Sequence, residues 1–218
     1  ASFHTMLAGG GPIPPHDIQR AQRRRLPILQ TYGMTETSSQ TATLRSEDAL
    51  RKIGSSGMPL FFNEIKIVNQ VDRIGEICIR GPHVTPGYVG HASNIRAQDE
   101  EGWLHTGDVG YIDDEGYLYV VDRRDDLIIS GGENIYPAEI EHTLLRYEGI
   151  VEVGVCGLEH DEWGEVPVAF LVVNDRFTEE GYARHCASSF ARYKRPFTYR
   201  IVSQLPRNAS NKLLRREL

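Results

Sequence analysis

The spacing of apolar and polar residues divides the chain into stretches with different patterns of secondary structure. Apolar residues predict strands at 4–8 and 28–32, separated by a glycine-rich loop at 9–12 and a helix at 14–25. Pro14 suits the start of this helix, because the fixed φ of proline is compatible with a first helical turn. The order strand, loop, helix, strand is typical of an α/β unit.

Between residues 64 and 121 the pattern changes to short strands. The segments EIKIV, GEICIRG and GYIDDEGYLYVV each predict strand, and the last predicts a hairpin that turns at 113–116. Aspartate and glycine are common in such turns, so we interpret Asp113 and Asp114 as hairpin surface. This middle region is therefore expected to be mostly β.

The charged run DRRDD at 122–126 then separates two apolar strands. Beyond it the pattern predicts a strand at 127–130, a Gly-Gly loop, a helix at 137–147, strands at 151–156 and 166–173, a helix at 178–190 and a strand at 199–202. We therefore expect a domain boundary at the charged run, with a larger unit at 1–122 and a smaller one at 123–218. The predicted fold class is mixed α/β plus β, followed by a small α+β domain.

Composition excludes several classes of protein. The 218 residues are 40% hydrophobic and 25% charged, which is ordinary for a soluble globular protein. The formal net charge of −6 argues against a nucleic-acid or anionic-membrane surface, and no apolar run approaches the roughly 18 residues of a membrane span. Three well-separated cysteines imply no disulfide framework and fit a reducing cytoplasm. Among them, Cys156 lies in an apolar strand and is expected in the core.

Common catalytic signatures are absent from the sequence. The chain contains no G-x-S-x-G elbow, no cysteine pair at metal-binding spacing, no histidines at i and i+4, and no G-x-x-x-x-G-K-[ST] loop. No single motif therefore assigns a function.

Six motifs in a fixed order are more informative. They are TYGMTETS at 31–38, GEICIRGPHVTPGY at 75–88, WLHTGDVG at 103–110, GYLYVVDRRDDLIISGGENIYPAEIE at 116–141, YKRP at 193–196 and LPRNASNKLLRREL at 205–218. Their order resembles the adenylate-forming superfamily of acyl-CoA synthetases, or AMP-binding enzymes, and the resemblance covers essentially the whole chain. Within that superfamily, QTYGMTETSSQ and ALRKIGSSGMPLFFNEIKI are most similar to o-succinylbenzoate–CoA ligases of menaquinone biosynthesis.

The resemblance implies an acid–thiol ligase that uses ATP and Mg²⁺ to convert a carboxylic acid into an acyl-adenylate and then transfers the acyl group to CoA. The implied acid is 2-succinylbenzoate. A fatty-acyl or aryl-CoA ligase, and a non-catalytic nucleotide-binding module of the same fold, are the alternatives. The expected partners are these small molecules, without nucleic acid or a membrane span, and a homo-oligomer is left open.

The resemblance also concerns the length of the chain. The family carries a further phosphate loop upstream of the matched motifs, and this sequence starts without methionine, as a truncated chain would. The chain is therefore expected to be the C-terminal part of an adenylate-forming enzyme, with a small mobile last domain, and to be inactive alone.

The resemblance assigns roles to residues of the first stretch. Thr35 is expected to offer its hydroxyl to a phosphate oxygen, and Glu36 to offer a hard oxygen ligand to Mg²⁺, although both residues could simply begin a helix. Tyr32 is expected to lie against adenine, with a core aromatic as the alternative. Gly10 belongs to a triple-glycine loop that the resemblance places beside the adenine and the acyl group.

The middle motifs supply the expected ribose site and hinge. Asp108 in HTGD can accept two hydrogen bonds from a ribose diol, although aspartate is also a common turn residue. The resemblance implies that Arg123 also reaches the ribose and that Asp125 is the hinge of the small domain. The family usually has glycine at the position of Asp122, which is expected to stiffen the approach to the hinge. A solvated charge cluster is the alternative.

The last motifs supply the expected thiol passage and catalytic lysine. Gly131 and Gly132 are implied to line a tunnel for the pantetheine arm of CoA, where a side chain would fill the space. Lys212 is implied to bridge the substrate carboxylate and the α-phosphate as charge builds. The family usually has glycine at the position of Asn211, and asparagine is expected to preserve the turn because it tolerates left-handed backbone angles.

Overall fold

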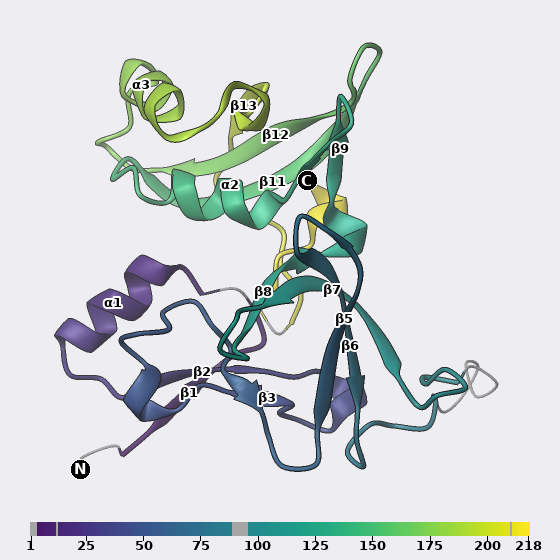
Figure 1. Ribbon diagram of the computed structural model, residues 1–218. Coiled ribbons are helices and arrows are strands. Elements are labelled where there is room, and N and C mark those ends of the chain that lie inside the picture. Colours follow the sequence, from purple (N-terminus) through teal and green to yellow (C-terminus); the bar gives the residue numbers. More distant parts are fainter. Residues whose placement is uncertain (1–3, 12, 89–95, 210) are drawn as a thin grey trace. The chain divides into compact units, whose positions relative to one another are not determined.

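The computed structural model describes residues 4–11, 13–88, 96–209 and 211–218 (Figure 1). The chain divides into two compact units, Ala1–Arg124 and Asp125–Leu218. No helix in the described ranges has the length and apolarity of a membrane span.

The first unit begins with a small mixed sheet. Strands β1 (Met6–Ala8) and β2 (Ile28–Tyr32) are parallel, and helix α1 (Pro15–Arg23) connects them, as a parallel crossover requires. Two short strands, β3 (Ala42–Thr43) and β4 (Met58–Pro59), extend the sheet in the order β1-β2-β3-β4, with β3 antiparallel to both β2 and β4. The expected α/β unit is confirmed; the helix starts one residue late because Pro14 is its N-cap.

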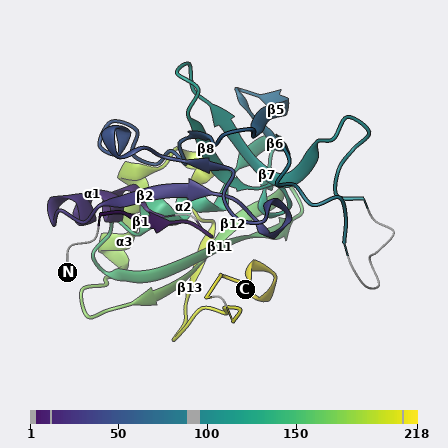
Figure 2. The same cartoon turned by 90° about the horizontal axis from the view of Figure 1, so that it is seen from below.

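The second sheet of this unit is an antiparallel meander. Its strands are β5 (Glu64–Val71), β6 (Ile74–Arg80), β7 (Leu104–Ile112) and β8 (Leu118–Arg123), which lie together in both views of the chain (Figures 1 and 2). The predicted turn at 113–116 closes the β7–β8 hairpin. The two sheets share a core of apolar side chains, namely Tyr32, Ala42, Ile77, Ile79, Val84, Leu104 and Leu118. This shared core holds the end of β2 close to β7.

The second unit is an α+β fold with a single sheet, and its α+β class was expected. Its elements are β9 (Ile128–Ser130), β10 (Glu133–Ile135), α2 (Pro137–Leu144), β11 (Ile150–His160), β12 (Gly164–Val173), α3 (Glu179–Ser189) and β13 (Thr198–Ile201). Strand β12 pairs antiparallel with β11 and β9, and parallel with β13. Both helices pack on one face of this sheet, because residues of α2, α3, β11 and β12 share a single apolar cluster.

Two details of this unit differ from the sequence predictions. Strand β10 was not predicted, because three residues are too few to show a periodicity. Cys156 is only partly buried, so its assignment to the core was wrong. Alternate residues of a strand face opposite sides, and the neighbouring Val155 occupies the side covered by the helices.

Candidate active site

The candidate ribose residues of the first unit meet around one buried carboxylate. Asp108, on β7, is only 8% exposed. Its Oδ2 accepts a hydrogen bond of 2.8 Å from the hydroxyl of Tyr32, at the end of β2, and its Oδ1 lies 3.3 Å from Nε of Arg123, at the end of β8. Burial, followed by the negative charge of Asp108, raises the pKa of Tyr32. The phenol therefore stays protonated and acts as a donor to the carboxylate.

Asp108 lies in an irregular stretch of strand β7 rather than in a turn, and groups other than its carboxylate fix the backbone there. The hydroxyl of Thr106 accepts a hydrogen bond of 3.0 Å from the N–H of Asp108 and donates one of 2.7 Å to the carbonyl of Ile77. Gly107 has a φ of 70°, a left-handed conformation that glycine adopts readily. The backbone of this stretch is thus held by Thr106, which leaves the Asp108 carboxylate to interact with side chains.

Glu76 supports the same stretch of β7 and was missed in the sequence. This buried residue of β6 accepts a hydrogen bond of 3.3 Å from the N–H of Gly107 through Oε1. Its Oε2 lies 3.4 Å from Nδ1 of His105 and 3.4 Å from a guanidinium nitrogen of Arg124. A glutamate inside the apolar strand GEICIRG was the signal, because a charge buried within a strand needs partners.

The glycine loop and the TETS motif lie at one edge of the first sheet. Gly9–Gly11 follows β1 and Thr35–Thr37 follows β2, so both segments leave the carboxyl ends of parallel strands, where open α/β sheets bind ligands. A Cβ at Gly9 would lie 2.7 Å from the carbonyl oxygen of Thr31, so this glycine permits close packing on β2. Gly10 has a φ of 85°, and a Cβ there would meet nothing within 4 Å. Pro12, the end of the predicted loop, lies outside the described residues.

Thr35 and Glu36 form a short 3₁₀ turn, Thr35–Thr37, rather than the start of an α-helix. Thr35 is exposed. Oε1 of Glu36 accepts a hydrogen bond of 3.1 Å from the hydroxyl of Tyr88, and its backbone carbonyl accepts one of 2.7 Å from the N–H of Thr85. Sequence reasoning missed Tyr88, which lies 52 positions away in the GPHVTPGY motif.

The donor set around Glu36 is compatible with Mg²⁺ held mainly by phosphates. The described residues contain no group of three or more His, Cys, Asp or Glu side chains that could hold a metal. Mg²⁺ in nucleotide sites, however, commonly has one or two carboxylate ligands and takes its others from phosphate and water. One partly buried carboxylate beside an exposed hydroxyl is consistent with that arrangement.

In the second unit, Gly131 and Gly132 form the turn of the β9–β10 hairpin. Ser130 pairs with Glu133, and the two glycines between them have φ values of 58° and 87°, as a type I′ turn requires. A Cβ at Gly131 would lie 2.9 Å from the ring of Trp163, whereas a Cβ at Gly132 would meet nothing within 4 Å. A Gly-Gly pair between two apolar runs was a hairpin signal that sequence reasoning took only as a loop.

Lys212 is exposed in a small hairpin near the C-terminus. Its backbone N–H donates to Oδ1 of Asn208 at 2.9 Å, its carbonyl accepts from the N–H of Asn208 at 2.9 Å, and Arg207 bridges to Leu213. Within the described part of the chain, its Nζ has no ion-pair partner. Asn211 has a φ of 62°, which confirms the expected left-handed turn; Ser210 lies outside the described residues.

The predicted hinge lies at the division between the units. The division falls between Arg124 and Asp125, within the 3₁₀ turn Arg124–Asp126. The side chain of Asp125 is exposed, and its carboxylate lies 3.9 Å from a guanidinium nitrogen of Arg216. Asp122 is buried, and its Oδ1 accepts a hydrogen bond of 2.8 Å from the N–H of Arg123, so its side chain restrains the backbone before the turn.

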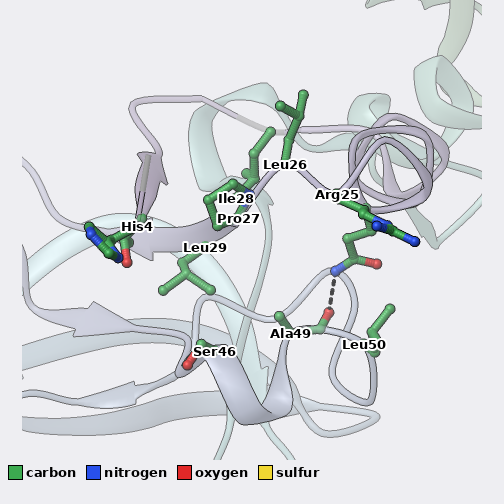
Figure 3. A pocket seen from close by; sticks show the side chains of 11 residues that line it. His4, Arg25, Leu26, Pro27, Ile28, Leu29, Ser46, Ala49 and Leu50 are labelled. Carbon is green, nitrogen blue, oxygen red and sulfur yellow. Dashed lines mark hydrogen bonds between the residues drawn. The ribbon is translucent and has the colours of Figure 1, made fainter. Parts of the chain in front are cut away.

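A separate pocket of about 280 Å³ lies in the first unit between the end of α1, the start of β2 and the 3₁₀ turn Ser46–Asp48 (Figure 3). Its wall is mainly apolar and includes Leu26, Leu29 and Leu50, with Gln22 donating a hydrogen bond of 2.8 Å to the carbonyl of Ala49. None of the residues predicted for the active site lines it. This pocket is therefore distinct from the candidate active site.

Comparisons with known sequences agree with the order of the motifs. A family model for AMP-binding enzymes matches residues 1–89, and a model for the AMP-binding enzyme C-terminal domain matches residues 139–212. A 2-succinylbenzoate–CoA ligase of Oceanobacillus iheyensis is 53% identical over 219 residues, and one of Bacillus cereus is 50% identical over 223. These alignments cover 99% and 100% of this chain but 46% of each relative, so the chain spans about half the length of the curated relatives it matches.

Solved structures give the same result. The o-succinylbenzoate–CoA synthetase of Bacillus subtilis, in complex with its acyl-adenylate intermediate, matches with a TM-score of 0.91 and 46% identity, over 98% of this chain and 45% of that one. The anthranilate CoA ligase AuaEII, in complex with anthranoyl-AMP, matches with a TM-score of 0.87 and 26% identity, over 98% and 43%. With both family models matched in chain order and the fold shared, the chain belongs to the family of AMP-binding, adenylate-forming enzymes.

Proposed function

We propose that this chain is the C-terminal part of an AMP-forming 2-succinylbenzoate–CoA ligase. The observation that carries the proposal is the buried Asp108 carboxylate of β7, which lies against Tyr32 at the end of β2 and Arg123 at the end of β8. Two relatives, 53% and 50% identical to this chain, are named 2-succinylbenzoate–CoA ligases, which supports the choice of acid. In this proposal the cosubstrates are ATP and CoA, the metal is Mg²⁺, and the location is the cytoplasm.

The first unit supplies the nucleotide-binding groups. Asp108 accepts hydrogen bonds from the ribose diol, and Arg123 binds beside it. Tyr32 is mostly buried in the core, and the small exposed part of its side chain lies against adenine while its hydroxyl orients Asp108. Gly10 allows the nucleotide and the acyl group to approach the backbone closely, and Thr35 donates its hydroxyl to a phosphate oxygen. When bound, Mg²⁺ would neutralise phosphate charge, and Glu36, oriented by Tyr88, would hold it.

The first half-reaction is adenylation. A carboxylate oxygen of the acid attacks the α-phosphorus of ATP, and the bond between that phosphorus and the bridging oxygen of pyrophosphate breaks. Negative charge increases on the α-phosphoryl oxygens as this happens, and an ammonium group placed there lowers the barrier. Lys212, exposed on its hairpin, supplies that ammonium group.

The second half-reaction is thioester formation. The sulfur of CoA attacks the acyl carbon, the carbon–oxygen bond to AMP breaks, and the thiol proton is lost. Gly131 and Gly132 line the passage of the pantetheine arm. Asp125, at the division between the units Ala1–Arg124 and Asp125–Leu218, is the hinge of a small mobile domain, so that different faces of that domain serve the two steps.

Two alternatives, an acyl-CoA ligase of other specificity and a non-catalytic nucleotide-binding module, can be distinguished from this proposal by enzyme assay. The test is pyrophosphate release and acyl-CoA formation by the complete enzyme, meaning this chain with the additional length that its relatives have. We expect 2-succinylbenzoate to be activated in preference to benzoate and to a medium-chain fatty acid. Preference for either of the latter acids would indicate another acyl-CoA ligase. ATP binding without pyrophosphate release would indicate a non-catalytic module, and the 218-residue chain alone is expected to show only background release.

A further inference from the structure

Arg215, near the C-terminus, connects three parts of the second unit. Its guanidinium group donates to both carboxylate oxygens of Glu141, on α2, with a distance of 2.9 Å for the Nη2–Oε2 contact. It also donates to the carbonyl of Val155, on β11, at 2.8 Å, and to Oδ2 of Asp126 at 3.1 Å. Its chain segment is thereby attached to a helix, a strand and the turn that carries the predicted hinge.

This attachment is buried and geometrically specific. The side chains of Arg215 and Glu141 are 13% and 12% exposed. Glu141 also accepts a hydrogen bond of 2.8 Å from the N–H of Val155. A guanidinium group matches a carboxylate with two parallel hydrogen bonds, which a lysine ammonium cannot reproduce. Replacing Arg215 would leave a buried carboxylate without its principal counterion.

The rest of the C-terminal segment is packed against the same strand. A Cβ at Gly154 of β11 would lie 3.0 Å from Leu218 and 3.3 Å from Leu213, so the absence of a side chain there lets the segment lie close to the strand. The hairpin that carries Lys212 ends at Leu213, two residues before Arg215. Lys212 is therefore an exposed side chain on a loop whose following residues are fixed.

We propose that Arg215 is a positioning residue for Lys212. It fixes the C-terminal segment to Glu141 and Asp126, so that the exposed lysine keeps a defined place within the second unit. This inference rests on the proposed role of Lys212 in adenylation. Loss of Arg215 would release the segment and lower the fraction of molecules in which the ammonium group is correctly placed, while thioester formation, which does not use Lys212, would be retained.

The test is a double-mutant cycle in the complete enzyme. Arg215→Gln is expected to lower kcat for adenylation by about 10–100-fold, with thioester formation from pre-made acyl-adenylate within about threefold of wild type. In a Lys212→Ala background, Arg215→Gln should cause no further loss, because residues that act through one another are not additive. Arg215→Lys should restore only part of the rate. The matched control is Arg176→Gln, which removes an arginine paired with Glu148 on the exposed surface of the same unit.

A second measurement reports on the segment without catalysis. Amide hydrogen exchange in the complete enzyme should accelerate at 207–218 in Arg215→Gln and stay unchanged in Arg176→Gln. If Arg215→Gln does not fold, Asp126→Asn replaces it, because this change weakens one contact and keeps the pair with Glu141; a smaller loss confined to adenylation is then expected. Equal loss of both half-reactions, additive loss in the Lys212→Ala background, or unchanged exchange would overturn the inference. A wild-type enzyme without adenylation activity would instead refute the proposed function.

Discussion

Replacing Asp108 by asparagine tests the proposed ribose site directly. The amide keeps the size of the side chain and one acceptor oxygen. In the unsubstituted chain the hydroxyl of Tyr32 donates to Asp108 at 2.8 Å, and that hydroxyl therefore still finds an acceptor in the variant. It removes the negative charge that pairs with Arg123 and replaces one acceptor oxygen by a donor. The variant therefore alters recognition of a diol more than it alters packing.

The magnitude follows from these contacts. A hydrogen bond to a charged group contributes about 1.5–3 kcal/mol, so losing one between Asp108 and the ribose should weaken AMP binding by about 10–150-fold. Arg123 is more than half exposed, so the loss of its ion pair should add little. The free energy of unfolding should fall by only about 1 kcal/mol, because the buried hydroxyl of Tyr32 keeps an acceptor.

The assay is calorimetric titration of the complete enzyme with AMP and with 2′-deoxy-AMP. Wild type should bind the deoxynucleotide more weakly, whereas Asp108→Asn should bind the two nucleotides almost equally, because the group that distinguishes them is gone. Asp114→Asn is the control, since that aspartate is 88% exposed and pairs with Arg73 on the surface. Wild-type affinity in folded Asp108→Asn, or undiminished discrimination between the nucleotides, would refute the assignment.

Three further predictions concern other groups. Lys212→Ala should lower kcat for adenylation by about 10²–10³ and spare thioester formation, as single-turnover measurement of each step would show; equal losses would contradict the assignment. Gly131→Trp should block thioester formation, so that acyl-adenylate accumulates after a single burst of pyrophosphate release. Loss of both steps in folded protein would instead indicate strain at the left-handed turn. Burial, followed by the charge of Glu76, raises the pKa of Cys78 to about 11, so at pH 8 this thiol should resist iodoacetamide in the folded chain and react after unfolding in urea. Cys156 is less buried, so mass spectrometry should show that iodoacetamide modifies it before Cys78. Rapid modification of Cys78 in the folded chain would contradict its burial.

Local features of the fold could be predicted from the sequence. The β7–β8 hairpin follows from alternating apolar residues on either side of a turn at 113–116, all within one short stretch. The left-handed Asn211 follows from the backbone preference of one residue type. The interpretation of Asp113 as mere surface was incomplete, because its carboxylate accepts hydrogen bonds from the N–H groups of Glu115 and Tyr117 and from Lys52 at 2.6 Å.

Contacts between distant residues could not be predicted in the same way. Tyr88 and Glu36 are 52 positions apart, and Glu76 and Gly107 are 31 apart, so no periodicity connects either pair. The outer ends of β11 and β12 extend beyond the apolar cluster of the second unit. Without burial there, the hydrophobic pattern predicted both strands too short.

Buried carboxylates explain how this fold holds its candidate residues. Asp108, Glu76 and Glu141 are each buried, and each lies against an arginine that follows it in the sequence. The pairs differ in burial, because the side chains of Arg123 and Arg124 are 53% and 61% exposed, whereas that of Arg215 is 13% exposed. In each case, removing the arginine leaves a buried carboxylate without its counterion, which costs more than the intact pair contributes. Such pairs therefore select one arrangement of backbone more than they stabilise the fold. In this chain the arrangements they select are the stretch of β7 around Asp108, the segment before the predicted hinge and the segment after Lys212, three places where displacement by a few tenths of an ångström would affect the proposed reaction more than folding.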